Sequence, residues 1–142
     1  MQHKIRWMVI AFLSGGLMLT ACQNHSNDHH VEHPAEVEQI DGAEISKVTL
    51  TEKAIERLAL KTDKVTEQGS KKAVPYSALI YDPMGQTWVY TSPQPRTFVR
   101  EQVTVERIDG DTAFLSDGPP SGTVVASVGV AELYGTEFEV GH

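Results

Sequence analysis

The chain has 142 residues, with 12 basic and 19 acidic side chains and a formal net charge of −7 when the histidines are neutral. This acidic balance argues against nucleic-acid binding and favours solubility, attraction of cations or a basic protein partner. Apart from a targeting segment at the start, the length is that of one domain.

Residues 1–21 have the features of a lipoprotein signal peptide. Lys4 and Arg6 form a basic start, and the apolar run at 7–19 is too short to cross a bilayer comfortably. The sequence Leu-Thr-Ala-Cys that ends at Cys22 resembles the lipobox of bacterial lipoproteins, in which the cysteine is acylated. The alternative is an uncleaved membrane anchor with an idle thiol.

Acylation of Cys22, the only cysteine, leaves no thiol for a disulfide, a thiolate nucleophile or a zinc–thiolate site. Cleavage before Cys22 leaves 121 residues with 10 basic and 19 acidic side chains, a net charge of −9. We therefore predict a lipid-anchored protein on the periplasmic side of the cell envelope. Gln23 resembles the residue after the cysteine in lipoproteins that are sent to the outer membrane, and it favours that membrane.

Residues 22–44 are predicted to form a flexible tether because they contain few large apolar residues and show no clear period. The tether also contains the only dense set of potential metal ligands. Imidazole suits Cu, Zn and Ni, although the spacing matches no defined site and polar tethers contain histidine by chance. Two interpretations therefore stay open: the tether binds a transition-metal ion weakly, or it binds no metal. The candidate ligands are His25, Asp28, His29, His30, Glu32 and His33.

The first ordered elements are predicted to be short strands and one short amphipathic helix. Thr51 is placed to cap the helix, because a threonine hydroxyl accepts a hydrogen bond from the first turn. The strands alternate weakly between apolar and polar residues. The predicted ranges are 46–50 and 60–66 for strands, 51–58 for the helix and 68–72 for a polar loop.

The stretch 74–105 is predicted to form the centre of a sheet. Asp82-Pro83-Met84-Gly85 has the residues of a tight turn, and β-branched and aromatic runs on both sides are typical of strands. The longest strand candidate is 97–108. Its two faces are predicted to hold Val99, Val103 and Val105 on one side, and Arg100, Gln102, Thr104 and Glu106 on a wet side.

The C-terminal part is predicted to add two more hairpin turns, at Asp109-Gly110-Asp111 and at 117–122, and an apolar strand at 123–130. A helical turn at 131–134 and a last strand at 137–140 complete the expected elements. Strands at this spacing indicate a mainly β fold. We expect one small antiparallel β-barrel or roll with one short helix at 45–142.

Two runs of sequence are similar to a known family. One is Val48-Thr49-Leu50-Thr51 with the short helix that follows it, and the other is Val-Pro-Tyr-Ser-Ala-Leu-Ile-Tyr at 74–81. They resemble, in this order, two segments of periplasmic adaptor proteins, or membrane fusion proteins, of resistance-nodulation-division (RND) efflux systems. The variant with Tyr76 and Tyr81 is closest to adaptors of heavy-metal systems. The later segments are similar in order and spacing, so that the resemblance covers nearly all of 45–142: the strands at 88–90, 98–105 and 124–129, the turn at 109–111 and the loop at 118–122.

The resemblance implies a small barrel-like roll, the membrane-proximal domain, which contacts the periplasmic part of an inner-membrane pump. In full adaptors, a lipoyl-like domain, a β-barrel domain and usually a helical hairpin separate the two halves of this domain. Here only residues 67–72 lie between those halves. The resemblance therefore implies an isolated membrane-proximal domain that binds an RND pump or a full-length adaptor. An outer-membrane location would strain direct contact with an inner-membrane pump.

No catalytic motif or phosphate-binding loop is evident in the sequence, so we expect a binding protein that is not an enzyme and requires no cofactor. A free-standing periplasmic metal-binding lipoprotein that uses the tether, and a structural relic without a pump, are the alternatives. Two residue sets are candidates for partner binding. Arg96, Arg100 and Arg107 form either a binding surface or a solvated face, and Tyr76, Tyr81, Trp88, Tyr90 and Phe98 form either a recognition patch or, more often for such residues, core.

Overall fold

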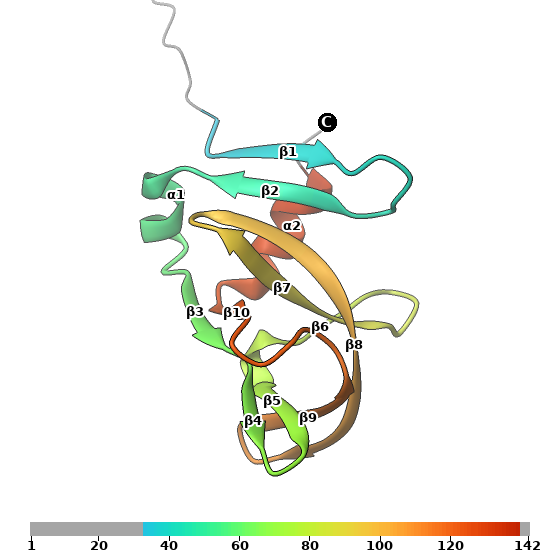
Figure 1. The fold of residues 1–142 in the computed structure, drawn as a ribbon. Helices are drawn as coiled ribbons and strands as arrows, with labels where there is room; N and C mark the ends of the chain where they lie inside the picture. Colours follow the sequence, from blue (N-terminus) through green and yellow to red (C-terminus); the bar gives the residue numbers. More distant parts are fainter. Residues whose placement is uncertain (1–32, 140–142) are drawn as a thin grey trace, which may run out of the picture. The chain divides into compact units, whose positions relative to one another are not determined.

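The computed structural model describes residues 33–139, which form a curled antiparallel sheet with helices packed against it (Figure 1). The predicted mainly β fold is confirmed. The strands are β1 (Ala35–Gln39), β2 (Ser46–Leu50), β3 (Lys61–Lys64), β4 (Thr66–Gln68), β5 (Lys71–Pro75), β6 (Ile80–Tyr81), β7 (Thr87–Gln94), β8 (Thr97–Asp109), β9 (Thr112–Asp117) and β10 (Val124–Val128). The helices are α1 (Glu52–Arg57), the 3-10 helix η1 (Tyr76–Ala78) and α2 (Val130–Glu139).

Strand β8 connects the two parts of the sheet. The strand order is β3-β10-β7-β8-β9-β5-β4, while β2 pairs with both β1 and β8, and β6 pairs with β7. The first half of β8 pairs with β7 and β2, and the second half pairs with β9 through register shifts that begin at Thr104. Because bulges bend a strand and increase its twist, these shifts curl the sheet.

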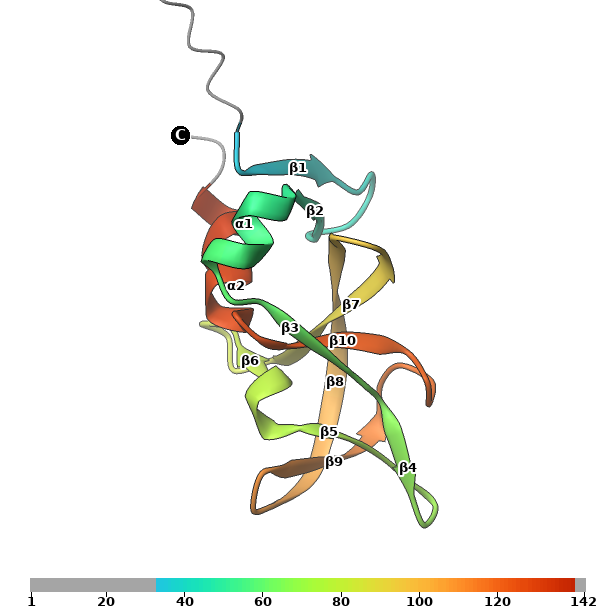
Figure 2. The same ribbon diagram turned by 90° about the vertical axis from the view of Figure 1, so that its left-hand side faces the viewer.

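Two hydrophobic cores lie on opposite faces of this sheet. Side chains alternate along a strand, so neighbouring residues such as Val89 and Tyr90 on β7 pack into different cores. Figures 1 and 2 show β1, β2 and both α-helices at one end, and β4, β5 and β9 at the other. The first core contains Ala35, Val48, Leu50, Ala54, Tyr90, Phe98, Ala126, Val130 and Leu133; the second contains Val65, Val74, Ala78, Leu79, Val89, Val103, Ala113, Leu115 and Val125.

Several local predictions are confirmed. In the turn between β6 and β7, the amide of Gly85 donates to the carbonyl of Asp82 at 2.9 Å, and Gly85 has φ +80°. Thr51 caps α1, because its hydroxyl accepts from the amide of Ala54 at 3.2 Å. The tight turn between β8 and β9 places Gly110 at φ +58°.

The N-terminal half of the domain pairs with the same sheet as the C-terminal half. β2 joins β8, and β3 joins β10, so the segment from Ile45 to Thr66 is part of the fold. The six residues at 67–72 lie within the β4–β5 hairpin, which has a tight turn at Gly69 and Ser70. The predicted strand at 60–66 is interrupted at Val65, whose side chain is buried in the second core.

The predicted boundary of the tether is wrong, because residues 35–39 form β1. This strand pairs with β2 in a register that sets Val37 against Val48. Ala35 is buried and Val37 is half-buried, whereas Glu36 and Glu38 are exposed. With only two apolar residues, the strand has a weak sequence signal, and its backbone partner on β2 stabilises it instead.

The predicted last strand at 137–140 is also wrong, because α2 continues to Glu139. The helix begins after Gly129, which has φ +79° and whose carbonyl accepts from the amide of Leu133. Leu133 and Glu137 are one turn apart and are both buried, so one face of the helix packs on the sheet. The alternation at Glu137-Phe138-Glu139 resembles a strand, but the packing of α2 on the first core decides the outcome.

Candidate functional site

Arg100 is the residue around which the candidate site is built. It lies on β8, and its side chain is only 5% exposed. The prediction that it faces solvent is wrong, because Arg100 shares a strand face with Phe98, and Phe98 packs in the first core beside α2. A buried guanidinium needs compensation for the water that it loses.

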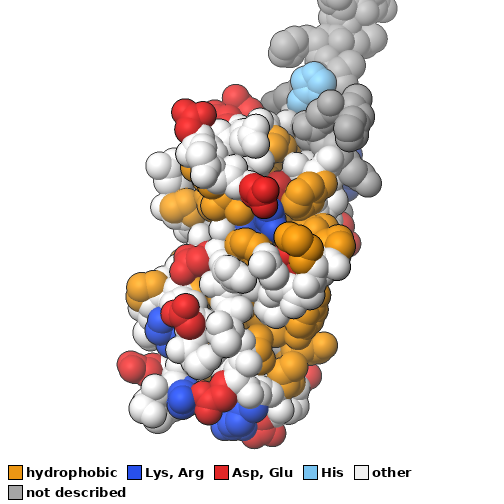
Figure 3. Space-filling model, turned by 90° about the vertical axis from the view of Figure 1, so that its right-hand side faces the viewer, with side chains coloured by type: hydrophobic (Ala, Val, Ile, Leu, Met, Phe, Trp, Pro, Cys, Tyr) orange, Lys and Arg blue, Asp and Glu red, His pale blue; other side chains and the backbone are white. Residues whose placement is uncertain are grey.

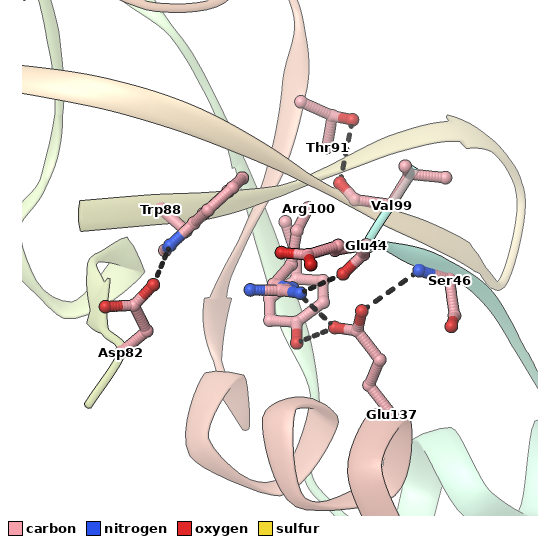
Figure 4. Close-up of polar contacts among 9 residues, drawn as sticks. Glu44, Ser46, Asp82, Trp88, Thr91, Val99, Arg100 and Glu137 are labelled. Carbon is pink, nitrogen blue, oxygen red and sulfur yellow. Dashed lines mark hydrogen bonds and ion pairs between the residues drawn. The ribbon is translucent and has the colours of Figure 1, made fainter. Parts of the chain in front are cut away.

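Glu137 on α2 supplies that compensation (Figure 4). Its Oε2 lies 2.8 Å from Nε of Arg100, and its side chain is 2% exposed. The N–H at Nε is not directed at this oxygen, so the contact is an ion pair without an aligned hydrogen bond. Nη2 of Arg100 also donates to the backbone carbonyl of Glu44 at 3.0 Å. Arg100 therefore ties β8 to α2 and to the connection between β1 and β2.

Tyr90 and Ser46 complete the coordination of the Glu137 carboxylate. The Tyr90 hydroxyl donates to Oε2 at 2.6 Å, and the amide of Ser46 donates to Oε1 at 3.0 Å. Burial raises the pKa of the Tyr90 phenol far above its usual value, and the hydrogen bond to Glu137 raises it further. Tyr90 therefore stays a neutral donor. Tyr90, Arg100 and Glu137 are called the buried polar network below.

Aromatic rings surround the guanidinium of Arg100. Its central carbon lies 4.6 Å from the ring centroid of Trp88, 5.0 Å from that of Phe138 and 5.8 Å from that of Tyr134. At these distances a cation is attracted by the negative face of an aromatic ring. The rings of Tyr134 and Phe138 are themselves in contact, with centroids 4.7 Å apart.

Asp82 fixes the outer edge of the site. Its Oδ2 accepts from Nε1 of Trp88 at 3.0 Å, and its Oδ1 accepts from the amides of Met84 and Gln86 at 2.9 and 2.8 Å. Desolvation acts to raise the pKa of the Asp82 carboxyl. The hydrogen bonds outweigh this effect, with the largest contribution from Trp88, and the pKa is lowered. The turn between β6 and β7 is thereby held against the indole ring beside Arg100.

These elements enclose a groove of about 1000 Å³. Met84 and Phe138 on its rim are 75% and 50% exposed, so two large apolar residues are accessible at the same groove. Figure 3 shows hydrophobic side chains gathered around a basic surface on this face, with acidic side chains close by. We call this hollow the Arg100 groove; its lining includes Val37, Asp82, Met84, Trp88, Arg100 and Phe138.

The three arginines predicted as partner-binding residues lie in different places. Only Arg100 lines the Arg100 groove. Arg96 is exposed in the turn between β7 and β8, with φ +63°. Arg107 forms an exposed ion pair with Asp109 at 3.1 Å, and its guanidinium lies 3.7 Å from the ring centroid of Phe114.

The aromatic candidates divide between core and surface. Tyr90 and Phe98 are buried in the first core, as the core interpretation predicted. Tyr76 and Tyr81 are 45% and 50% exposed. Trp88 is half-buried and lines the Arg100 groove, where it contacts Arg100.

Most of the predicted metal and lipid sites lie outside the described residues. These are Cys22 and the five candidate ligands His25, Asp28, His29, His30 and Glu32. His33 is described and exposed. Within 33–139, no three histidine, cysteine or acidic residues are grouped to hold a metal ion, and no helix in this range has the length and hydropathy needed to cross a membrane.

Sequence reasoning missed Glu137, although it is the partner that holds Arg100. The available signal was the spacing of Leu133 and Glu137, which are four residues apart and share one face if the segment is a single helix. The prediction of a helical turn at 131–134 and a strand at 137–140 placed these two residues in different elements. Comparison with protein-family models, curated proteins and solved structures finds no match to this chain. The Arg100 groove and the sequence resemblance are therefore the bases for a functional proposal.

Proposed function

We propose that this protein is a non-catalytic, lipid-anchored component of the bacterial cell envelope that binds another protein through the Arg100 groove. The observation that supports this most directly is the exposure of Met84 and Phe138 beside the fixed guanidinium of Arg100. Exposed apolar side chains that are rimmed by polar residues mark protein-interaction sites. The buried polar network holds this site on strands and a helix rather than on a loose loop.

The proposed partner is an RND-type pump, or a full-length adaptor, of a heavy-metal efflux system. The sequence resemblance supports this assignment. It is consistent with the β4–β5 hairpin at the position where adaptors have their additional domains, and with the pairing of the flanking segments into one sheet. The membrane anchor in this proposal is lipidated Cys22, and mass spectrometry of the N-terminal peptide from the native protein tests that part.

Photocrosslinking in the native cells tests the partner. Benzoylphenylalanine is introduced in place of Met84, which lines the groove, and in place of Ile108, a matched exposed residue outside it. We expect the probe at position 84 to give an adduct that contains a pump or adaptor subunit, and the probe at position 108 to give none. The same adduct from both positions, or none with an efflux protein at position 84, would contradict the proposal.

The alternative function, a free-standing metal-binding lipoprotein, predicts a different pair of results. No protein adduct forms at position 84, and calorimetric titration of the chain with Cu or Zn shows binding that is lost when His25, His29, His30 and His33 are replaced by asparagine. Equal heats for the two proteins would exclude this alternative.

A further inference from the structure

The charges of the Arg100 groove are unevenly distributed between its floor and its rim. On the floor, the positive charge of Arg100 is balanced by Glu137, with Oε2 of Glu137 2.8 Å from Nε of Arg100. The rim adds two acidic residues, Asp82 and Glu44. The carboxyl group of Asp82 is stabilised in its ionised form by three hydrogen-bond donors. The lining as a whole therefore has an excess of negative charge.

Arg100 nevertheless offers hydrogen-bond donors to a ligand. Within residues 33–139, the hydrogen bonds of its guanidinium to protein acceptors involve Nη2 alone, which donates to Glu44. Figure 4 shows the guanidinium between Glu137 and the side of the groove on which Trp88 and Asp82 lie. Because a guanidinium has five N–H groups, the Nη1 edge is left for an acceptor in the groove.

We propose that the Arg100 groove binds a peptide segment of a partner protein in which a basic residue adjoins an apolar residue. A backbone carbonyl of the segment accepts from Nη1 of Arg100, and the apolar side chain packs between Met84 and Phe138. The basic side chain lies beside the Asp82 and Glu44 carboxylates. The inference rests on the proposed function, in that it specifies the chemistry of the partner that the groove binds.

An acidic segment fits the groove less well. Its carboxylate would approach Arg100, but that charge is already balanced by Glu137, and Asp82 and Glu44 would repel it. A neutral carbonyl makes the same hydrogen bond without this repulsion. The acidic net charge of the whole chain, −7, also favours encounter with a basic partner.

Selection from a random decapeptide library displayed on phage tests the proposed chemistry. The full chain in detergent micelles is the target, and the same chain with Met84→Ser and Phe138→Ser is the subtraction control; Ile108→Ser is the matched surface control. We expect enriched peptides to contain lysine or arginine beside leucine or an aromatic residue, and to bind the Ile108→Ser protein normally. Enrichment of acidic peptides, no enrichment, or equal binding to the subtraction control would overturn the proposal.

Trp88 provides the quantitative measurement. The chain contains two tryptophans, and Trp7 lies in the predicted signal peptide; Trp7→Phe leaves Trp88 as the only one even in uncleaved protein, and its fluorescence reports on the groove. For an enriched peptide, Glu44→Gln with Asp82→Asn should weaken binding about 2- to 30-fold, since each exposed ion pair contributes roughly 0.2–1 kcal/mol. Glu44→Gln alone leaves the β6–β7 turn intact and should give part of this loss. Unchanged affinity in both variants would overturn the role of the rim.

The outcomes separate this inference from the proposed efflux role. If basic–apolar peptides bind the groove but the photocrosslinked adduct contains no efflux protein, the proposed groove chemistry is supported and the proposed efflux partner is wrong. If the probe at position 84 gives an adduct with an efflux protein but the selection yields acidic peptides, the proposed partner is supported and the proposed groove chemistry is overturned.

Discussion

The two cores of this protein differ in what they bury. The second core, between β5, β9 and the second half of β8, is built from apolar residues such as Val74, Val103 and Leu115. The first core, beneath α2, has Tyr90 among its members and lies against the ion pair of Arg100 and Glu137. Only the first core is next to the Arg100 groove.

The contrast indicates what the buried polar network is for. Well-packed apolar residues stabilise a fold as well as a buried ion pair does, and often better, because the ions lose their hydration. The second core shows that this chain can build an apolar core. We infer that the first core contains Arg100 and Glu137 because they position the groove, and the following predictions test that difference.

Removal of one member of the ion pair should have the largest effect on stability. Glu137→Ala leaves the Arg100 guanidinium buried without a counter-charge, and should lower the free energy of unfolding by about 3–5 kcal/mol. Equilibrium unfolding in urea measures the change. A loss below about 1 kcal/mol would mean that water compensates Arg100 and that the network is not rigid.

A cavity in the second core should destabilise the protein without changing the groove. Leu115→Ala removes a fully buried side chain and should cost about 2–5 kcal/mol. The affinity for a groove-binding peptide should stay within about 2-fold of wild type, because sites without shared contacts behave additively. A large loss of affinity in folded Leu115→Ala protein would show that the two cores are coupled.

Deletion of one hydroxyl should have an intermediate effect. Tyr90→Phe keeps the ring in the first core and removes the donor to Oε2 of Glu137, so the free energy of unfolding should fall by about 1.5–3 kcal/mol. The matched control is Tyr76→Phe, which removes the hydroxyl of an exposed tyrosine on η1 and should be neutral. Equal stabilities for Tyr90→Phe and Tyr76→Phe would argue against the hydrogen bond.

The smallest effect is expected at the rim, and it depends on pH. The pKa of Asp82 is lowered in the folded state, so its contribution to stability is present above the unfolded value of 3.8 and is lost as the pH falls through the folded value. In the Trp7→Phe protein, the fluorescence of Trp88 should therefore change only below about pH 4. Asp82→Asn should abolish this transition. A transition near neutral pH would show that the titration of another group changes the fluorescence of Trp88.

The parts of the fold that sequence reasoning predicted are those that local chemistry determines. The turn at Asp82 and Gly85, the cap at Thr51 and the turn at Gly110 each depend on a few neighbouring residues. The longest strand followed from its β-branched residues, and it is observed as β8.

Long-range packing accounts for the predictions that were wrong. Alternation alone placed Arg100 on a solvated face, because nothing near it in sequence indicates that Glu137, on a helix, covers it. Strand β1 has few apolar residues and depends on β2 for its hydrogen bonds. The candidate site was therefore found only in part, through Arg100 and Trp88, while its buried carboxylate was missed.

One triple variant tests the central claim, that the buried polar network positions the groove rather than supplying stability. Tyr90→Phe, Arg100→Met and Glu137→Leu together replace the network by apolar side chains of similar size. We predict a free energy of unfolding equal to or higher than that of wild type, with loss of binding to a groove-selected peptide in the same protein. A stable triple variant that binds the peptide with unchanged affinity would contradict the account.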